Sequence, residues 1–580
     1  MKTPGYPDLR AHCVDLFATA LKAVAPDVQA QVVLEKPKQA QHGDYACNVA
    51  LQLAKALQRS PRDIARLLVA ALPASSYVEK AEIAGPGFIN VFIQASVKRA
   101  FVHHALKAGN DYGATNAGRG KRVQVEFVSA NPTGPLHVGH GRGAAYGASV
   151  ANILAAAGYD VSREYYVNDA GRQMDILALS TWLRYLELHE ISLPFPRNAY
   201  QGDYVVAMAR QVQEAHGARY VHTPTEVTAG APGAETDAEG HLDALIANAK
   251  TLLGGDYEYI HAHALNEQLV DCREDLTEFG VTFDHWFSER SLYDAGLVQA
   301  AMEKLQQLGH LYEQDGAKWF RSTDFGDEKD RVVQRENGQY TYFASDIAYH
   351  LNKFERHFDS VIDVWGADHH GYVPRVKGAL RALDVDPERL VVALVQFAVL
   401  YREGQKVSMS TRSGDFVTLR ELRREVGNDA ARFFYVLRKS DQHLDFDLDL
   451  AKSQTNENPV YYVQYAHARV CSVYEQWGGD AGVLANAPLD ALTAEPELRL
   501  LERLYEYPEI VQNAARELAP HLVAFYLREL AADFHSYYNG SRFLVDEDAV
   551  KHARLALAGA VRQVLHNGLA LLGVTAPEKM

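Results

Sequence analysis

The sequence predicts an α/β protein built from three parts in chain order: a small α/β unit over residues 1–110, a doubly wound parallel-sheet domain with insertions over 111–450, and an all-α unit over 451–580. The length of 580 residues exceeds what one hydrophobic core supports. A strand–helix–strand pattern between residues 123 and 167 indicates the parallel sheet. From about Asn456 onward, apolar residues recur at helical spacing almost without interruption.

The N-terminal part alternates helix and strand signals. Residues 44–57 carry apolar residues at helical spacing, and Ser60-Pro61 begins an amphipathic helix that runs to Leu72. Glycine and proline at 85–87 then lead into a strand of alternating polarity that ends at Ile93. A polar, glycine-rich link over 113–120 precedes the central part.

The central part opens with an alternating strand over 123–128, the turn NPTGP, a helix of small residues over 136–157 and a second strand over 161–167. The run LVVALVQFAVLY over 390–401 is too short to span a bilayer and contains Gln396, so we expect a buried strand. The small, polar and acidic composition of residues 222–240 predicts a mobile insertion.

Composition limits the class of protein. The net charge of −16 argues against a protein that coats nucleic acid with its whole surface, but it allows a local basic face. The first ten residues lack the apolar core of a signal peptide, which predicts a cytoplasmic protein without membrane attachment. The four cysteines are scattered, which excludes a disulfide framework and an all-cysteine zinc site. We expect no protein-bound metal, and we expect a monomer.

The strongest chemical signal is the tetrapeptide His137-Val138-Gly139-His140, directly after the NPTGP turn. Two imidazoles three residues apart on the first helical turn project from one side. A helix N-terminus attracts phosphate, and the imidazoles add donors for charge that develops as pyrophosphate leaves a nucleotide. The alternative is that the two histidines only cap the helix.

Five ordered blocks resemble the arginyl-tRNA synthetase family of class I aminoacyl-tRNA synthetases: SANPTGPLHVGH at 129–140, YVNDAGRQ at 166–173, WGADHHG at 365–371, NDAARFF at 428–434 and NPVYYVQYAHAR at 458–469. The resemblance implies a Rossmann-like catalytic domain, an N-terminal additional domain that holds the tRNA elbow, and a C-terminal anticodon-binding domain. It implies ATP (as Mg-ATP) and L-arginine as substrates and tRNA(Arg) as partner.

The resemblance also assigns the nucleotide site. The implied ATP-binding residues are Ala130, Asn131, Pro132, Thr133, Gly134, Pro135, Leu136, His137, Val138, Gly139, His140, Gly143, Met409 and Ser410. The second class I signature, KMSKS, aligns in two ways, as KVSMS at 406–410 or as SMSTR at 408–412, and the downstream GDFVTL favours the second. Lys406 and Arg412 flank this loop and, with His137 and His140, are the catalytic candidates.

Arginine recognition requires carboxylates, because a guanidinium offers forked donors that match them. By resemblance, the arginine-binding candidates are Glu126, Asn131, Tyr342, Asp346 and His370. The tRNA-binding candidates are Phe88, Asn90, Tyr461, Tyr465 and Arg469. We also expect Arg432, Arg469 and Arg542 on a basic face that contacts tRNA phosphates.

Three rival functions remain at this point. A nucleotidylyltransferase shares the HxGH motif on a helix but does not need tRNA-sized flanking domains. A nicotinamide-dependent oxidoreductase is suggested by Gly141-Arg142-Gly143 with Gly147, but ten residues separate these glycines from the strand end. An RNA-binding paralogue without catalysis would show no ATP turnover.

Overall fold

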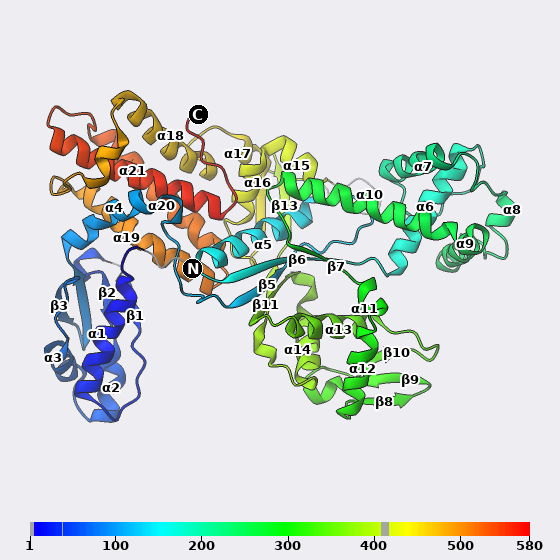
Figure 1. The fold of residues 1–580 in the computed structure, drawn as a ribbon, viewed down its shortest axis with the longest axis horizontal. Helices are drawn as coiled ribbons and strands as arrows, with labels where there is room; N and C mark the ends of the chain where they lie inside the picture. The colour runs from blue at the N-terminus through cyan, green and yellow to red at the C-terminus, as the bar shows by residue number, and fades with distance from the viewer. Residues whose placement is uncertain (1–4, 38, 408–416) are drawn as a thin grey trace.

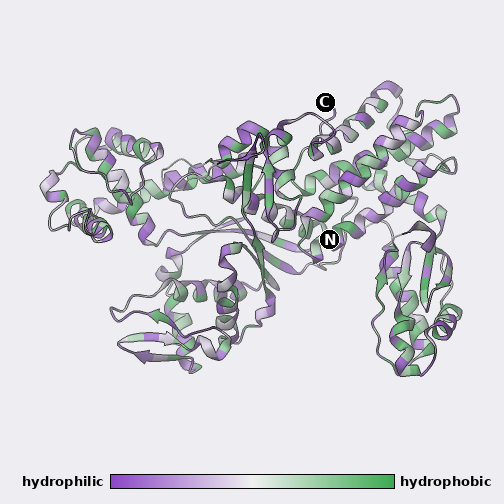
Figure 2. Ribbon diagram, turned by 180° about the vertical axis from the view of Figure 1, so that it is seen from behind, coloured by the Kyte–Doolittle hydropathy of each residue, from purple (hydrophilic) through white to green (hydrophobic). Residues whose placement is uncertain are grey.

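The computed structural model describes residues 5–37, 39–407 and 417–580. The chain forms an N-terminal α/β unit, a central sheet domain with two insertions, and a helical C-terminal domain that lies between the first two (Figure 1). Hydrophilic and hydrophobic residues alternate along most helices (Figure 2). The predicted fold class is confirmed, and the three domain limits stay predictions.

The N-terminal unit packs helices on one antiparallel sheet of order β1-β2-β4-β3. Its elements are α1 (Leu9–Val24), β1 (Leu34–Glu35), η1 (Ala40–His42), β2 (Tyr45–Cys47), α2 (Val49–Leu57), α3 (Pro61–Ala71), β3 (Val78–Ala84), β4 (Phe88–Ile93), α4 (Ala95–Ala108) and η2 (Gly109–Asp111). Ser60 caps α3 as predicted, accepting from Asp63 N at 3.1 Å. The helix predicted from residue 44 is wrong over Tyr45–Cys47, because these residues pair with β4 and bury alternate side chains.

The central domain contains a five-stranded parallel sheet of order β12-β11-β5-β6-β7. The strands are β5 (Arg122–Glu126), β6 (Asp160–Val167), β7 (His285–Ser288), β11 (Ser360–Gly366) and β12 (Leu390–Val395). The chain proceeds from β5 outward through β6 and β7, then returns to the other side of β5 with β11. The carboxyl ends of β5 and β11 therefore form the switch point, where ligands bind in sheets of this kind.

Helices cover both faces of this sheet (Figure 1). The connection from β5 to β6 is α5 (Val138–Ala156), and α13 (Tyr342–Glu355) and α14 (Val373–Ala382) flank β11 in sequence. Phe127 follows β5 and packs its ring against Gly147 of α5. The preceding residue, Glu126, points to the opposite face, where Lys353 of α13 meets it.

The first insertion is a helical lobe at one end of the molecule (Figure 1). It comprises α6 (Arg172–Leu188), α7 (Asp203–His216), α8 (Pro224–Val227), α9 (Ala238–Leu253) and α10 (Asp256–Glu278). Residues 222–240, predicted as a mobile insertion, carry structure that their composition did not indicate. Thr223 caps α8, Val227 is fully buried, and Asn248 donates to the carbonyl oxygens of Val227 and Ala229 at 2.9 Å each.

The second insertion precedes β11. It comprises α11 (Arg290–Asp294), α12 (Leu297–Gln307), the antiparallel sheet β10-β9-β8 and η3 (Ser322–Phe325), with strands β8 (Leu311–Gln314), β9 (Ala317–Phe320) and β10 (Arg331–Gln334). Its buried apolar residues form one cluster with apolar side chains of α13, among them Phe343, Ile347 and Leu351. The insertion therefore supports the helix that carries Asp346.

The apolar run over 390–401, expected as one strand, forms two strands of two different sheets. β12 belongs to the parallel sheet, whereas β13 (Ala398–Arg402) pairs with β14 (Gln405–Lys406) and β15 (Leu444–Asp447). Gln396 lies between β12 and β13. Its main-chain N–H donates to Ser440 O at 2.8 Å, and its main-chain carbonyl oxygen accepts from Arg142 Nη1 at 2.7 Å. The buried guanidinium of Arg142 hydrogen-bonds the Gln396 carbonyl, which has no strand partner where the chain leaves the parallel sheet.

The C-terminal domain is helical, as predicted. Its helices are α18 (Pro459–Trp477), η6 (Ala481–Asn486), α19 (Glu495–Arg516), α20 (Pro520–Gly540) and α21 (Asp548–Leu571). The helices of the central part not yet given are η4 (Ala367–Tyr372), η5 (Pro387–Arg389), α15 (Leu419–Val426), α16 (Asn428–Tyr435) and α17 (Leu448–Lys452). Within the residues that the structure describes, no helix combines the length and apolar character that crossing a membrane requires.

We predict that Gly147→Ala destabilises the protein although alanine favours helix. An added Cβ would overlap the Phe127 ring, and overpacking of this kind costs about 1–3 kcal/mol. The matched control is Gly143→Ala on the same helix, whose Cβ would meet no atom within 4 Å; it should stabilise by about 0.5–1 kcal/mol. Melting temperatures from scanning calorimetry decide the matter, and equal shifts for the two variants would contradict the packing argument.

Candidate active site

A cavity of about 530 Å³ opens at the carboxyl ends of β5 and β11. It gathers predicted residues from both proposed substrate sites: Glu126, Ala130, Asn131, His137, Gly139, His140, Gly143 and Asp346. The sequence separates the first seven from Asp346 by about two hundred residues, and the switch-point topology unites them. The position agrees with where doubly wound sheets bind ligands.

The two histidines of HVGH form a reciprocal cap at the start of α5. His137 Nδ1 accepts from Gly139 N at 3.0 Å, and His140 Nδ1 accepts from His137 N at 3.3 Å. Their rings stack at 3.7 Å between centroids. Since an accepting ring nitrogen carries no hydrogen, each neutral imidazole holds its proton on Nε2 and presents a donor there. The capping interpretation is therefore correct in geometry, and both rings line the cavity.

The turn between β5 and this helix is strained. Val128 and Ser129 both have positive φ, +67° and +42°, which is rare for any residue other than glycine and exceptional for a β-branched one. The turn brings Ser129 Oγ back toward the strand end, where it donates to Glu126 Oε1 at 2.8 Å and accepts from Tyr166 N at 3.1 Å. Strain at such a position is typical of functional sites.

Three carboxylates stand side by side on the sheet face below α13. Asp363, Glu126 and Glu164 occupy paired positions on the adjacent strands β11, β5 and β6, and we call them the acidic row. Their side chains point to one face about 5 Å apart, so they would repel without cations. All three are buried, with 0%, 7% and 0% exposure.

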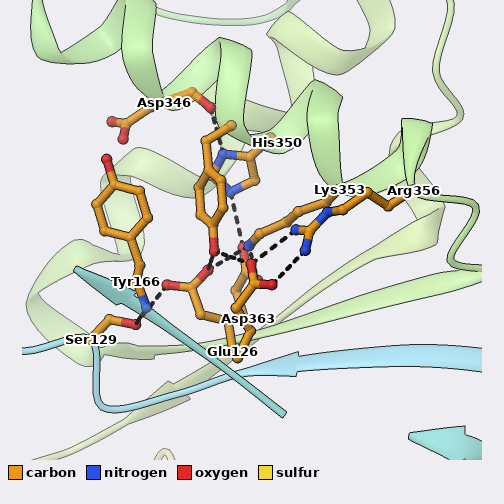
Figure 3. A network of polar contacts seen from close by, with 10 residues as sticks. Glu126, Ser129, Tyr166, Asp346, His350, Lys353, Arg356 and Asp363 are labelled. Atoms are coloured by element: carbon orange, nitrogen blue, oxygen red, sulfur yellow. Dashed lines mark hydrogen bonds and ion pairs between the residues drawn. The ribbon is translucent and has the colours of Figure 1, made fainter. Parts of the chain in front are cut away.

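Helix α13 and its C-terminal residue supply the cations (Figure 3). Lys353, fully buried, binds Asp363 Oδ1 at 2.7 Å and also contacts Glu126 Oε2. Arg356 binds both oxygens of Glu164, at 2.5 and 2.9 Å. Burial alone would lower the pKa of Lys353, but the carboxylates of Asp363 and Glu126 raise it above its ordinary value. The Lys353 ammonium and His350 hold the pKa of Asp363 at about 2 against the effect of burial.

His350 also contacts the row. Its Nε2 lies 2.9 Å from Asp363 Oδ2 and its Nδ1 lies 2.7 Å from the Asp346 carbonyl oxygen. Lys353, Arg356 and His350 thus all bind the acidic row from the α13 side.

Asp346 lines the cavity one turn before Tyr349 and His350 on α13. Its Oδ2 accepts from the Tyr372 hydroxyl, and Figure 3 shows the Tyr166 ring directed toward the same carboxylate. Burial raises the pKa of Asp346. No ion pair to Asp346 occurs within residues 5–37, 39–407 and 417–580. A half-buried carboxylate without an ion pair favours a cationic ligand.

Of the other predicted arginine-binding residues, Asn131 lines the cavity, whereas Tyr342 and His370 do not. Asn131 lines the cavity and donates to Gln173 Oε1 at 2.7 Å. Tyr342 begins α13 on the same helix as Asp346, as predicted, but it is 56% exposed and does not line the cavity. His370 lies on the exposed side of η4, where its Nδ1 is 3.2 Å from Ala367 O, while Asp368 and His369 line the cavity instead.

Some of the predicted nucleotide-binding residues line the cavity, and others only support the turn that precedes α5. Leu136 and Val138 are buried at 2% exposure, and Thr133 O accepts from Tyr204 in the first insertion at 2.7 Å. Pro132, Gly134 and Pro135 complete this turn without lining the cavity. Lys406 is exposed at the end of β14. Met409, Ser410 and Arg412 lie outside the described residues.

Several residues of the cavity were missed from the sequence. Tyr166, Trp365, Tyr372 and Phe397 line it, and Phe397 is 48% exposed at its rim. Tyr166 and Trp365 each begin one of the five resembling blocks, so block position was a usable signal for both. Phe397 lies within an apolar run and carried no such signal. Among the described residues, no group of three His, Cys, Asp or Glu side chains is arranged to hold a metal ion.

The predicted tRNA-binding residues lie outside the cavity. Tyr461, Tyr465 and Arg469 share one half-buried face of α18, with the tyrosine rings 5.9 Å apart and the Arg469 guanidinium 4.4 Å from the Tyr465 ring. Phe88 is half-buried at the start of β4, and Asn90 is only 7% exposed.

The expectation that Arg432 belongs to a basic surface is wrong. It is 1% exposed and donates to Leu572 O and Phe279 O at 2.9 Å each. Arg432 therefore ties the C-terminal helix to the end of α10, whereas Arg542 is exposed as expected.

Sequence comparison covers nearly the whole chain. Residues 12–93 match the model described as "Arginyl tRNA synthetase N terminal domain", residues 101–194 and 248–447 match "tRNA synthetases class I (R), catalytic domain", and residues 463–580 match "DALR anticodon binding domain". An "Arginine--tRNA ligase" from Azoarcus sp. is 67% identical over 99% of this chain and 100% of its own length, and one from Nitrosospira multiformis is 66% identical over 100% of both.

The chain belongs to the arginyl-tRNA synthetase family. The structure agrees: an arginyl-tRNA synthetase from Thermus thermophilus superposes with a TM-score of 0.76 at 25% identity, covering 99% of this chain and 100% of that one. The family predicted from the five ordered blocks is confirmed, and the rival oxidoreductase and nucleotidylyltransferase classes are excluded. The catalytic family model omits residues 195–247, which contain α7 and α8 and the first half of α9 of the helical lobe.

We predict that His137 and His140 of this arginyl-tRNA synthetase fold stay neutral as pH falls through 6.5. Burial lowers the pKa of both rings, and the neighbouring His137 helps to bring that of His140 to about 3. An ordinary histidine, with a pKa near 6.5, would be mostly imidazolium at about pH 5.5. NMR of ¹⁵N-histidine-labelled free protein should show two Nε2–H tautomers at that pH, assigned by their absence in His137→Asn and His140→Asn. Imidazolium signals for either ring would contradict the capping geometry.

Proposed function

We propose that the chain activates L-arginine with ATP and transfers it to the 3′ end of tRNA(Arg), with the cavity between β5 and β11 as the active site. The observation that supports this most is the juxtaposition, in one cavity, of a helix N-terminus bearing two imidazoles and a half-buried carboxylate, Asp346, that has no ion pair among the described residues. The first suits a phosphate and the second a guanidinium.

At the nucleotide end, ATP enters as Mg-ATP, the ion arriving with the substrate. The positive N-terminal end of the α5 dipole and the imidazoles of His137 and His140 stabilise the α-phosphate as the arginine carboxylate attacks it and pyrophosphate departs. Gly139 and Gly143 leave room for the nucleotide beside the helix, and the exposed ring of Phe397 offers a stacking surface at the rim. Lys406 and Arg412 supply positive charge to the pyrophosphate.

At the amino-acid end, Asp346 is the principal acceptor. Lys353, Arg356 and His350 bind the acidic row, whereas Asp346 is a carboxylate of the cavity wall without an ion pair among the described residues, and a bound guanidinium would supply one. Glu126 and Asn131 line the same wall and assist. Tyr342 and His370 contribute only after a movement toward the cavity, because both side chains face solvent here.

Two surfaces meet tRNA. The aromatic and cationic face of Tyr461, Tyr465 and Arg469 suits stacking of anticodon bases and a phosphate contact. Phe88, half-buried on the N-terminal unit, suits stacking with a base of the tRNA elbow, and Asn90 contributes through the strand pairing that positions it. The enzyme acts as a monomer in the cytoplasm, which light scattering and cell fractionation test.

We predict that His137→Ala and His140→Ala each lower kcat for arginine charging about a hundredfold, the usual effect of removing one transition-state donor. KM for ATP should change little, because the interaction strengthens as pyrophosphate leaves. His137→Asn is the control, since asparagine also caps helices and should preserve the melting temperature. If His137→Asn restores kcat as well as stability, the histidine only caps the helix.

We predict that Asp346→Asn raises KM for arginine by several hundredfold while KM for ATP stays nearly constant. Loss of one partner of a buried charged pair costs roughly 3–5 kcal/mol. Discrimination against citrulline, an uncharged isostere of arginine, should fall in the same variant. Steady-state charging with arginine and ATP varied separately measures both constants; a change in arginine KM below about twofold would mean that the carboxylate does not meet the substrate.

A further inference from the structure

We propose that Lys353 is a positioning residue for arginine binding: its ammonium, shared between Glu126 and Asp363, keeps the Glu126 carboxylate ionised and fixed in the cavity wall. This inference rests on the proposed function of the cavity. Lys353 itself does not line the cavity, so its effect passes through Glu126 (Figure 3).

The argument begins with the sheet. Glu126 and Asp363 are register partners on adjacent parallel strands, with side chains on the same face. Two buried carboxylates at that spacing cannot both stay ionised unless a cation lies between them. Lys353 fills that place, with 0% exposure and Nζ in contact with Glu126 Oε2 and 2.7 Å from Asp363 Oδ1.

The environment of Glu126 shows what Lys353 maintains. Burial raises the pKa of Glu126, and the Lys353 ammonium is the chief influence in the opposite direction. Ser129 Oγ donates to Oε1 at 2.8 Å, and the Tyr349 hydroxyl lies 3.0 Å from Oε2. An ionised carboxylate offers about four acceptor sites. Ser129 and Lys353 occupy two of them, and the single Tyr349 proton lies closer to Glu164 Oε1, at 2.7 Å, so acceptor capacity remains for a donor from the cavity.

Removal of the Lys353 ammonium is expected to weaken arginine binding in two ways. Glu126 takes up a proton, because an unpaired buried carboxylate favours the neutral form. Its side chain also loses the contact that fixes its orientation. The cavity then presents one negative charge fewer to the guanidinium, while the nucleotide end of the cavity, built on α5, is unaffected.

The test compares Lys353→Met with the double variant Lys353→Met/Asp363→Asn in the full-length enzyme. Lys353→Met should raise KM for arginine about tenfold to a hundredfold, as when a residue that orients a cation's ligand is removed, and should lower the melting temperature. KM for ATP should stay within about twofold of the wild type. The double variant removes the repulsion and should recover the melting temperature, yet KM for arginine should remain high.

The double variant separates positioning from mere structural support. If KM for arginine returns to the wild-type value together with stability, or if Lys353→Met leaves that KM within about twofold, the proposal is wrong. Should the single variant fail to fold, the double variant carries the measurement. Lys98→Met is the matched control, because Lys98 also bridges two carboxylates, Asp44 and Glu502, far from the cavity; its KM for arginine should not change.

The same assays keep the two proposals apart. A wild-type enzyme that does not charge tRNA with arginine refutes the proposed function. A wild-type enzyme that does, combined with an unchanged arginine KM in Lys353→Met, refutes only the role of Lys353.

Discussion

The arrangement of the cavity depends on the electrostatic match between the acidic row and α13. Asp363, Glu126 and Glu164 are buried across three adjacent strands, and Lys353, Arg356 and His350 meet them from one helix. Unpaired, such carboxylates would strongly destabilise the fold. Because the pairing fixes how α13 lies on the sheet, it also fixes Asp346, two turns before Lys353, at the cavity. The proposed arginine acceptor and the stability of the sheet therefore depend on the same helix.

The opposite face of the sheet depends on shape rather than charge. Phe127 packs against Gly147, which lets α5 approach β5 closely and directs its N-terminus at the strand end. The strained turn at Val128 and Ser129 makes this short connection possible. Alternation along one strand thus assigns Glu126 to the charged face and Phe127 to the packed face, and the two faces deliver the two halves of the cavity.

Two buried arginines join segments distant in the sequence through main-chain carbonyls. Arg142 of α5 donates to Gln396 O and Gln442 O at 2.7 and 2.8 Å, and Arg432 donates to Leu572 O and Phe279 O. Burial lowers the pKa of each to about 10, so both remain charged at neutral pH. Each satisfies several carbonyl groups where distant segments meet: Arg142 fixes α5 against the segments around Gln396 and Gln442, and Arg432 fixes the end of α21 against the end of α10.

Sequence alone determined the domain order, the strand–helix–strand unit and the family, because periodicity and local motifs are properties of contiguous residues. It also indicated His137, His140 and Glu126, which lie in or just before a recognisable block, and Asp346, which was assigned by family resemblance. Tertiary structure decided what these residues contact. That Lys353 lies between Glu126 and Asp363, that Arg432 is buried rather than basic surface, and that residues 390–401 divide between two sheets all follow from pairings between distant strands. Register and burial are set by the whole packed fold, and no local pattern encodes them.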